Sequence, residues 1–489
     1  MKRKITNILL RTPVVLLLIA GCSKEGDTEN VFSDGILIEV EAPQINGWST
    51  EEITGTRSVR TKTVEVKGKD GLDMEISMQH GMAETAAAGG ATTRWANMDD
   101  NIAFQVVAYK SATAAGISTS NYAGYGNYKL SGSSVLAVKS LLVSVGTYTF
   151  VFYSYGNSSS IAAFTNSSTS VSATNGQNFM TYVKPGVTIN NTGSKYTLGG
   201  IVFKHHCARY RVQAITQAGR MGAITACSGT VTLPKHNATY TFTDGAFAIQ
   251  ATTGSANITW TNPDAMSVYS DYVYLLPQTS ANITMKLNPT IDGRAFTDKS
   301  FTLSGITLAA NNTYYSDVSF TTTLGYIVRG SFWANGNLYY DGTFNIYAEQ
   351  HEFNTGRAHD FWRWGALYPT DAYADTSTWT QDPCQQASPA KSWRLPTVAE
   401  YTSLTKGYSK QTTQNGKAGA IFDDIVFFPA AGYYPGFNTD AYSQPIRGLY
   451  WASSGLRMMY YHADNVYVPA MNTSDHQDNY MTIRCVRAD

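Results

Sequence analysis

Apolar and polar residues alternate in short segments along most of this chain, and this pattern constrains the fold more than any other feature. Ile36, Ile38 and Val40 are separated by single residues, and the segment at 74–78 repeats the pattern. Because successive side chains of a strand point to opposite faces, such alternation predicts half-buried β-strands. A composition with 32 tyrosines and only 15% charged residues also favours strands and turns. The sequence therefore predicts a mainly β protein.

A change of character divides the chain, because six of the nine tryptophans lie beyond Tyr326. Thr397, with Glu400 three residues later, forms a capping box that predicts a short helix with Tyr401 and Leu404 on its apolar face. At about 150 residues per domain, the length allows roughly three domains. The predicted parts are a signal peptide at 1–21, a flexible tether at 22–34, two transthyretin- or immunoglobulin-like β-sandwiches at 35–197 and 198–322, and an α+β domain at 323–489.

The first residues have the form of a lipoprotein signal. Lys2, Arg3 and Lys4 stand ahead of the apolar run from Val14 to Ala20, and small residues lead directly into Cys22. This predicts a secretory signal that is cut before Cys22, whose thiol then carries a lipid. The alternative is a short transmembrane anchor with an incidental cysteine, but the run is shorter than the roughly 20 apolar residues of a spanning helix.

Charge and motifs give little support for catalysis. Basic and acidic residues balance at 36 each, which disfavours a nucleic-acid partner. The sequence has no GxGxxG, no phosphate-binding loop and no HExxH. His205, His206 and Cys207 are adjacent, so on a strand they point to alternate faces and do not converge on a metal. Ser388 and Lys391 match an SxxK motif, but a proline lies inside it and no KTG accompanies it. We expect no enzyme activity, no metal and no cofactor.

Several segments of the first 320 residues form a recognisable set: the lipidation motif at Cys22, the loop ATTR ending at Arg94, the strand GTYTFVFYS from Gly146, the segment LGGIVFKHHCARYRV from Leu198, and LAANNTYYSDVSF from Leu308. With these motifs, residues 35 to 320 resemble the fimbrillin family of bacterial pilus subunits.

The resemblance implies how such a precursor matures. An arginine-specific protease removes an N-terminal segment that includes a β-strand, and another pilin subunit fills the groove with a strand of its own. Arg94 is the predicted cut, with Arg57 and Arg60 as rivals. The alternative is that Arg94 is an ordinary solvated arginine.

The C-terminal part contains the motifs SWRLPT from Ser392, FFPAAGYY from Phe427, GLYWASS from Gly448 and the final IRCVRAD. With these motifs it resembles C-type-lectin-like domains. The calcium-and-sugar tripeptides of true C-type lectins, EPN or QPD followed by WND, are absent, as is the additional cysteine pair of the related sulfatase-activating enzymes. Neither of those activities is expected here.

Cysteine pairing follows partly from this resemblance. Apart from Cys22, four cysteines allow three pairings in a compartment where disulfides persist. The lectin-like fold implies a disulfide between Cys384 and Cys485. A second pair, Cys207 with Cys227, is the weaker prediction, with free buried thiols as the alternative.

Aromatic residues with polar neighbours near the end of the chain are the candidate ligand contacts, since aromatic faces suit sugar rings or peptide surfaces. The alternative is that half or more of them form the core of the domain. The group consists of Tyr433, Tyr434, Tyr450, Trp451, Tyr460 and Tyr461, with His462, Asp464 and Asn465.

These observations predict a lipidated precursor on the outer membrane that matures into the tip subunit of a pilus. The sequence ends inside a folded domain, so we expect the subunit to accept a strand from another pilin but not to give one. Its C-terminal domain would bind a glycan or protein ligand on a host or bacterial surface. Two rival hypotheses are an outer-membrane lipoprotein that captures glycans and, more weakly, a surface hydrolase.

Overall fold

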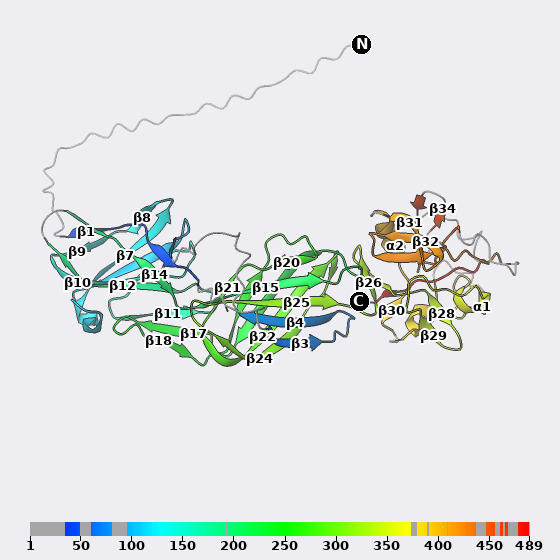
Figure 1. Cartoon of the computed structure of the whole chain (residues 1–489), viewed down its shortest axis with the longest axis horizontal. Helices are drawn as coiled ribbons and strands as arrows, with labels where there is room; N and C mark the ends of the chain where they lie inside the picture. Colours follow the sequence, from blue (N-terminus) through cyan, green and yellow to red (C-terminus); the bar gives the residue numbers. More distant parts are fainter. Residues whose placement is uncertain are drawn as a thin grey trace, which may run out of the picture.

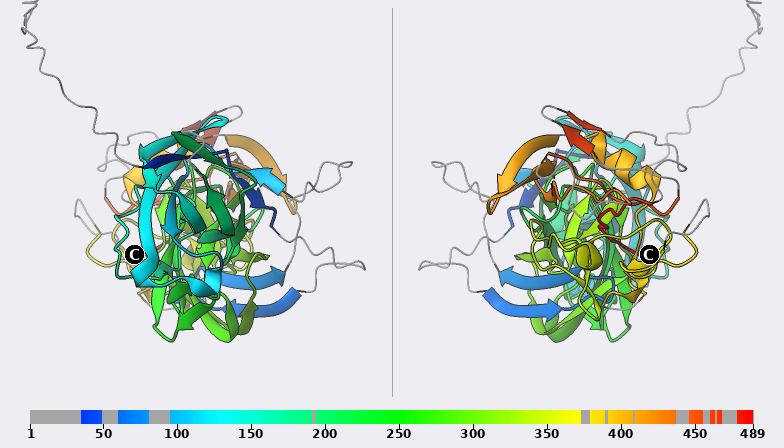
Figure 2. Two further views of the ribbon diagram at one scale, coloured as in Figure 1. Left: turned by 90° about the vertical axis from the view of Figure 1, so that its left-hand side faces the viewer. Right: turned by 90° about the vertical axis from the view of Figure 1, so that its right-hand side faces the viewer.

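The computed structural model describes residues 35–48, 60–80, 95–190, 194–372, 379–388, 391–407, 409–436, 446–454, 460–462, 465–467 and 478–488. Strands dominate these residues, which confirms the prediction of a mainly β protein. Three parts lie in a row along the long axis (Figure 1), and seen from either end they overlap (Figure 2). Within the described residues, no helix combines the length and apolar character needed to cross a membrane.

The first part is built around an eight-stranded sheet. Its order is β5 (Trp95–Asn97), β2 (Gln44–Asn46), β14 (Val202–His205), β12 (Met180–Ile189), β10 (Gly146–Ser154), β6 (Ala103–Tyr109), β7 (Tyr122–Ser131) and β8 (Ser134–Lys139). Two short 3₁₀ helices, η1 (Ala114–Gly116) and η2 (Thr119–Asn121), connect β6 to β7.

Smaller sheets cover both faces of this large sheet. One contains β13 (Lys195–Leu198), β1 (Ile36–Val40) and β9 (Leu141–Val143), and the other contains β11 (Ser170–Thr174), β17 (Asn237–Thr241) and β18 (Phe247–Gln250). Two separate apolar cores fill the space on either side. The central strand β10 pairs with both β12 and β6, and it is buried from Tyr148 to Ser154, as its apolar sequence predicts.

The second part is a sandwich of two sheets around one core. The first sheet has the order β20 (Ser267–Tyr269), β15 (Ala208–Thr216), β25 (Thr313–Thr321), β4 (Asp73–His80) and β3 (Arg60–Val66), with β21 (Val273–Leu275) also paired to β15. The second has the order β19 (Gly254–Thr259), β16 (Ile224–Leu233), β22 (Gln278–Ile291) and β23 (Arg294–Ala295), with β24 (Lys299–Leu308) also paired to β22.

Strand pairing does not follow the predicted boundary between residues 197 and 198. The strands β3 and β4 were expected in the first sandwich, but β4 pairs along its full length with β25 of the second. Conversely, β11 of the first part pairs with β17. The physical reason is that alternation fixes which face of a strand is buried, but not which sheet supplies the partner. Met74, Ile76 and Met78 fill the core of the second sandwich.

The C-terminal part combines small sheets with short helices. One sheet has the order β26 (Gly325–Val328), β27 (Ser331–Ala334), β36 (Val486–Arg487) and β30 (Trp393–Arg394), and another has the order β31 (Ser409–Gln414), β32 (Lys417–Phe422) and β33 (Val426–Pro429). Two further sheets are pairs of strands: β28 (Leu338–Tyr340) with β29 (Phe344–Ile346), and β34 (Tyr460–His462) with β35 (Asn465–Tyr467). Its helices are α1 (Arg357–Asp360), η3 (Pro383–Gln386) and α2 (Val398–Thr405).

The capping box at the start of α2 is confirmed. The Thr397 side chain accepts a hydrogen bond from the Glu400 backbone N–H, and the Glu400 carboxylate accepts one from the Thr397 N–H. Tyr401 and Leu404 are buried, as the helical spacing predicts. Arg394 pairs with the same carboxylate at 2.8 Å, and these contacts together lower the pKa of Glu400 although burial opposes the shift.

The C-terminal part is tied to the second sandwich by polar contacts. The Ile327 N–H donates to the Arg220 carbonyl at 2.8 Å, and the Arg220 guanidinium donates to Asn335 at 2.7 Å. Arg487 of β36 donates to the Lys69 carbonyl in the turn between β3 and β4, at 2.6 Å. The hairpin β3–β4 therefore contributes to the core of the second sandwich and to its junction with the C-terminal part.

Candidate functional site

The strand β1 occupies an internal position in its sheet. It runs parallel to β13, with Ile38 opposite Tyr196, and antiparallel to β9, with Ile38 opposite Leu141. Backbone hydrogen bonds continue at the ends of the strand, where the Leu37 N–H donates to the Ser194 carbonyl at 2.9 Å. Because β1 lies between two partners, its removal would leave two unpaired strand edges facing each other.

Alternate side chains of β1 fill the core of the first part. Ile36, Ile38 and Val40 are buried, and Ile38 is only 1% exposed. The Tyr128 hydroxyl donates to the Ile38 carbonyl at 2.9 Å beneath the strand. Burying three aliphatic side chains of this size stabilises by roughly 5–9 kcal/mol. Removal of β1 would therefore expose a long apolar groove that a strand with apolar residues at every second position can fill.

The chain after β1 continues the same contacts. The strand β2 runs parallel to β14 and antiparallel to β5. Beyond it, the Trp48 ring stacks on His205 with ring centroids 3.8 Å apart, and the Arg209 guanidinium lies over Trp48 at 5.1 Å. Burial and the nearby arginine lower the pKa of His205 to about 3. Residues 36 to 48 thus follow the first part as one continuous segment, and its end at Trp48 also contacts Arg209 of β15 in the second sandwich.

The predicted cleavage sites fall at different places relative to this segment. Arg57 and Arg94 lie outside the described residues, as does the predicted lipidation site Cys22, and Arg60 is the first residue of β3. A cut after Arg57 would separate only β1 and β2 from the remaining chain, and a cut after Arg60 would also remove the first residue of β3. A cut at Arg94 would also separate β3 and β4, with the buried core residues of β4. The preference for Arg94 therefore does not fit the strand pairing.

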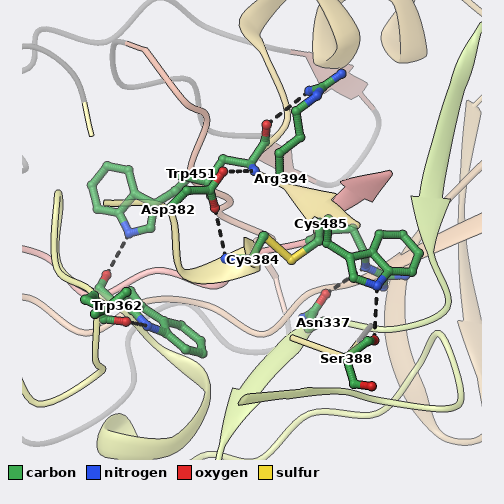
Figure 3. Close-up of a disulfide and its surroundings, with 12 residues drawn as sticks. Asn337, Trp362, Asp382, Cys384, Ser388, Arg394, Trp451 and Cys485 are labelled. Atoms are coloured by element: carbon green, nitrogen blue, oxygen red, sulfur yellow. Dashed lines mark hydrogen bonds between the residues drawn. A yellow bond between two sulfur atoms is a disulfide. The ribbon is translucent and has the colours of Figure 1, made fainter. Parts of the chain in front are cut away.

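A disulfide between Cys384 and Cys485 lies at the centre of the C-terminal part, in the pairing that the lectin-like resemblance implied. Figure 3 shows its surroundings. The Asp382 carboxylate accepts hydrogen bonds from the backbone N–H groups of Cys384, at 2.9 Å, and Leu395, at 2.8 Å. The Trp451 indole N–H donates to the Trp362 carbonyl at 2.6 Å. These contacts fix η3 against the core.

The fully buried Arg484 organises the other side of this core. Its guanidinium donates to the Asn337 side chain at 3.0 Å and to four backbone carbonyls, which belong to Ala334, Asn335, Gln350 and Phe427. Burial lowers the pKa of Arg484. Its role is structural, because its donors are directed at main-chain oxygens inside the domain.

The candidate aromatic ligand contacts do not form one surface. Trp451 and Tyr450 are fully buried, and Tyr434 is 4% exposed and packs edge-to-face on Phe361. The prediction that Tyr434 and Trp451 contact a ligand is therefore wrong, because the small domain uses its largest rings to build a core. Tyr433 is half-buried and packs against the same core as Trp451.

The remaining candidates lie at a short hairpin of two strands. Tyr460, Tyr461 and His462 form β34, and Asn465 begins β35, which pairs with it. Asp464 lies outside the described residues. The side chains of β34 and β35 stay candidates on sequence grounds alone.

The structure also forms a pocket that the sequence did not single out. It has a volume of about 480 Å³ and is lined by Trp379 and by residues in and beside η3, including Gln381, Asp382, Gln385 and Gln386. The available signal was the run QDPCQQ, in which three glutamines surround Cys384. Their convergence depends on η3 and on the disulfide, which the local sequence does not specify.

The adjacent residues His205, His206 and Cys207 do not share a strand, because β14 ends at His205 and β15 begins at Ala208, and their side chains have separate partners. The His205 ring contacts Asn178 at 2.7 Å, the His206 ring contacts Thr181 at 2.7 Å, and the Cys207 thiol contacts the Gln177 carbonyl at 3.3 Å. Within the described residues, no group of three or more histidine, cysteine, aspartate or glutamate side chains is arranged to hold a metal ion.

The weaker disulfide prediction is wrong. Cys207 and Cys227 are free thiols. The two residues belong to different cores, since Cys207 packs beside the eight-stranded sheet and Cys227 lies on β16 of the second sandwich. Burial raises the pKa of both thiols to about 12. They behave as small apolar side chains, which was the alternative interpretation.

Comparison with known proteins gives structural likenesses but no sequence match. No protein-family model and no curated protein matches this chain. A candidate cell adhesion protein from Bacteroides fragilis is 15% identical, with a TM-score of 0.38, over 59% of this chain and 97% of that one.

Two fimbrial proteins from Porphyromonas gingivalis are also similar. The fimbrial anchor protein Mfa2 is 11% identical, with a TM-score of 0.25, over 51% of this chain and 77% of that one. The tip fimbrial protein Mfa3 is 9% identical, with a TM-score of 0.25, over 46% of this chain and 94% of that one.

Proposed function

We propose that this chain is a surface adhesin of the fimbrial type, which accepts a β-strand from another pilin subunit in its first part and presents its C-terminal part to a ligand. One observation carries the proposal: β1 is an internal strand, and residues 49–59, with Arg57 among them, separate it and β2 from β3 in the chain. Cleavage in this segment would leave β1 no longer covalently joined to its sheet, so that its release leaves an empty groove. An incoming strand gains main-chain hydrogen bonds on both sides and pockets for alternate side chains.

We further propose Arg57 or Arg60, and not Arg94, as the maturation site. A cut ahead of β3 leaves the second sandwich intact, including the contact of Arg487 with Lys69. A cut at Arg94 would detach β4, which lies between β3 and β25. The second core would then depend on a hairpin no longer joined to the chain.

The arrangement of the three parts supports a position at the end of a fibre. In Figure 1 the part that holds β1 lies at one end and the C-terminal part at the other. The strand β36 lies between β27 and β30, and its neighbour Cys485 is held by the disulfide, so it is not available for donation. Lipidation at Cys22 would hold the precursor on the outer membrane until cleavage releases it.

Limited proteolysis tests the proposal. The chain from Ser23 onward is treated with an arginine-specific protease, and the new N-terminus is sequenced. We expect it at Ser58 or Thr61. The double variant Arg57→Ala/Arg60→Ala should resist this cleavage, whereas Arg94→Ala should be cut like the wild type. Cleavage of the wild type at Arg94 alone would refute the proposed site.

Strand exchange is tested on the cut protein. After β1 and β2 are removed in mild denaturant, a labelled peptide with the sequence of residues 35–44 should bind the groove. The same peptide with Ile38→Asp is the control, because it places a charge in the apolar core. Equal binding of both peptides, or of neither, would contradict a strand-accepting groove.

A further inference from the structure

The pocket beside η3 has the chemistry of a site for an uncharged, hydroxyl-rich ligand. From these contacts we infer that it binds a neutral sugar without calcium. The inference rests on the adhesive part of the proposed function for its biological meaning, and it adds the ligand class and the place of binding. It is independent of strand exchange, because the pocket lies wholly within the C-terminal part.

Polar groups line the pocket without partners of their own. Gln381, Gln385 and Gln386 are exposed, and no hydrogen bond engages their amide groups in the described part of the chain. Each amide offers two donors and an acceptor with two lone pairs. Sugar hydroxyls both donate and accept, so a row of free amides can satisfy several of them at once. Thr380 and Ser453 add two hydroxyl groups to the same lining.

Trp379 supplies an apolar surface beside these amides. Its ring packs edge-to-face against Trp364 with centroids 5.4 Å apart, and it is only half-buried. A ring held in this way is a rigid platform for the C–H face of a sugar. Its indole nitrogen is buried and has no hydrogen-bond partner, unlike the indole of Trp451.

The charges of the lining exclude other ligand classes. Asp382 is the one charged residue that the described lining contains, and its carboxylate already accepts two backbone hydrogen bonds. The described lining has no basic side chain, so these residues offer no counter-charge for a phosphate, sulfate or carboxylate group. A single engaged carboxylate is also far from the six to eight oxygen ligands that calcium takes.

The site is preorganised by the fold. Asp382 caps η3, the Lys391 N–H donates to the Gln385 carbonyl at 2.9 Å, and Cys384 ties the helix to Cys485. A volume of about 480 Å³ lies within the range of small-molecule sites. Binding therefore needs little ordering of the protein, which favours measurable affinity for a small sugar.

Saturation-transfer NMR on the uncut chain tests the inference. The probes are glucose, galactose, mannose, fucose, N-acetylglucosamine and N-acetylgalactosamine, with N-acetylneuraminic acid as an anionic comparison. We expect at least one neutral sugar to bind, equally well with and without EDTA. The triple variant Gln381→Ala/Gln385→Ala/Gln386→Ala should weaken that binding at least tenfold.

Two further variants show whether a loss of binding is specific to the pocket. Gln411→Ala removes an exposed glutamine from β31 and should leave binding unchanged. Thr380→Arg fills the pocket from an exposed position and should abolish binding while the thermal unfolding of the chain is unaltered. The inference is overturned if no neutral sugar binds, if only the anionic sugar binds, or if the triple variant binds like the wild type. Strand exchange would be untouched by any of these results.

Discussion

At the scale of single residues, buried polar side chains carry much of the specificity of this fold. Arg484 is fully buried with no carboxylate partner among the described residues, and four carbonyl oxygens from three separate segments accept its hydrogen bonds. His205 and His206 are held neutral inside the first part. The stability of the C-terminal part therefore depends on Arg484, and that of the first part depends on His205 and His206.

We expect Arg484→Lys to destabilise the C-terminal part by about 3–5 kcal/mol, because the lysine keeps a buried charge but loses the planar set of donors. Urea unfolding followed by tryptophan fluorescence measures the loss. Arg357→Lys is the control, since Arg357 lies over the Tyr480 ring and a lysine can keep that contact at a cost below about 1 kcal/mol. Equal effects of the two substitutions would contradict the assigned role.

The buried histidines predict acid sensitivity in the uncut protein. Burial lowers the pKa of His205 to about 3 and that of His206 to about 4, whereas an unfolded histidine titrates near 6.5. Below pH 6.5 the unfolded chain therefore binds more protons, and stability is lost as the pH falls toward 4, by about 1.4 kcal/mol per pH unit for each histidine.

Thermal unfolding between pH 7 and pH 4 checks this prediction. The variant His205→Gln keeps a polar side chain beside Asn178 but removes one titrating group. Its stability should fall less steeply with pH than that of the wild type. Parallel pH profiles of the two proteins would show that His205 does not contribute.

At the scale of elements, β1 differs from most other strands of the first part because a single cut in the chain after β2 is enough to detach it. It is joined to the rest of the chain only through β2 and residues 49–59, yet it is paired on both sides. Its outer face carries the ion pair between Glu39 and Lys195 at the solvent-exposed surface. Such a pair adds little to stability, so the buried side chains determine how firmly the strand is held.

Ile38→Ala should destabilise the uncut protein by about 2–5 kcal/mol, because it leaves a cavity in the core beneath β1. Once residues up to Arg57 or Arg60 have been removed, the variant and the wild type should unfold at the same temperature. Leu37→Ala, on the opposite face, serves as the control with a smaller effect. Calorimetry before and after cleavage makes the comparison, and a difference that survives cleavage would place Ile38 outside the removed segment.

At the scale of the whole molecule, each of the three parts has a different proposed role. The first holds the exchangeable strand, the second is a sandwich completed by β3 and β4, and the third contains the disulfide and the pocket. The contacts of Arg220 and Arg487 across the second junction join the sandwich to the C-terminal part. A load on the C-terminal part is therefore passed to the second sandwich through several bonds and not only through the chain.

Loss of the disulfide should affect the C-terminal part selectively. It closes a loop with a sequence separation of 101 residues, for which chain entropy predicts about 4–5 kcal/mol. In urea, a reductant should lower the unfolding midpoint of the C-terminal part by the same amount as Cys384→Ala/Cys485→Ala. The double variant should not respond to reductant. An unchanged transition in reduced wild-type protein would contradict this role.

The sequence by itself determined the mainly β fold class of this protein and several local features. Alternation predicted strands, the apolar run around Phe150 and Phe152 predicted a central strand, and Thr397 with Glu400 predicted α2, because these signals act between near neighbours. Tertiary structure decided what depends on distant partners. It assigned β4 to the second sandwich, buried Trp451, left Cys207 free and gathered the glutamines around Trp379. An alternating strand shows which face it buries, but only the packed fold decides against which sheet.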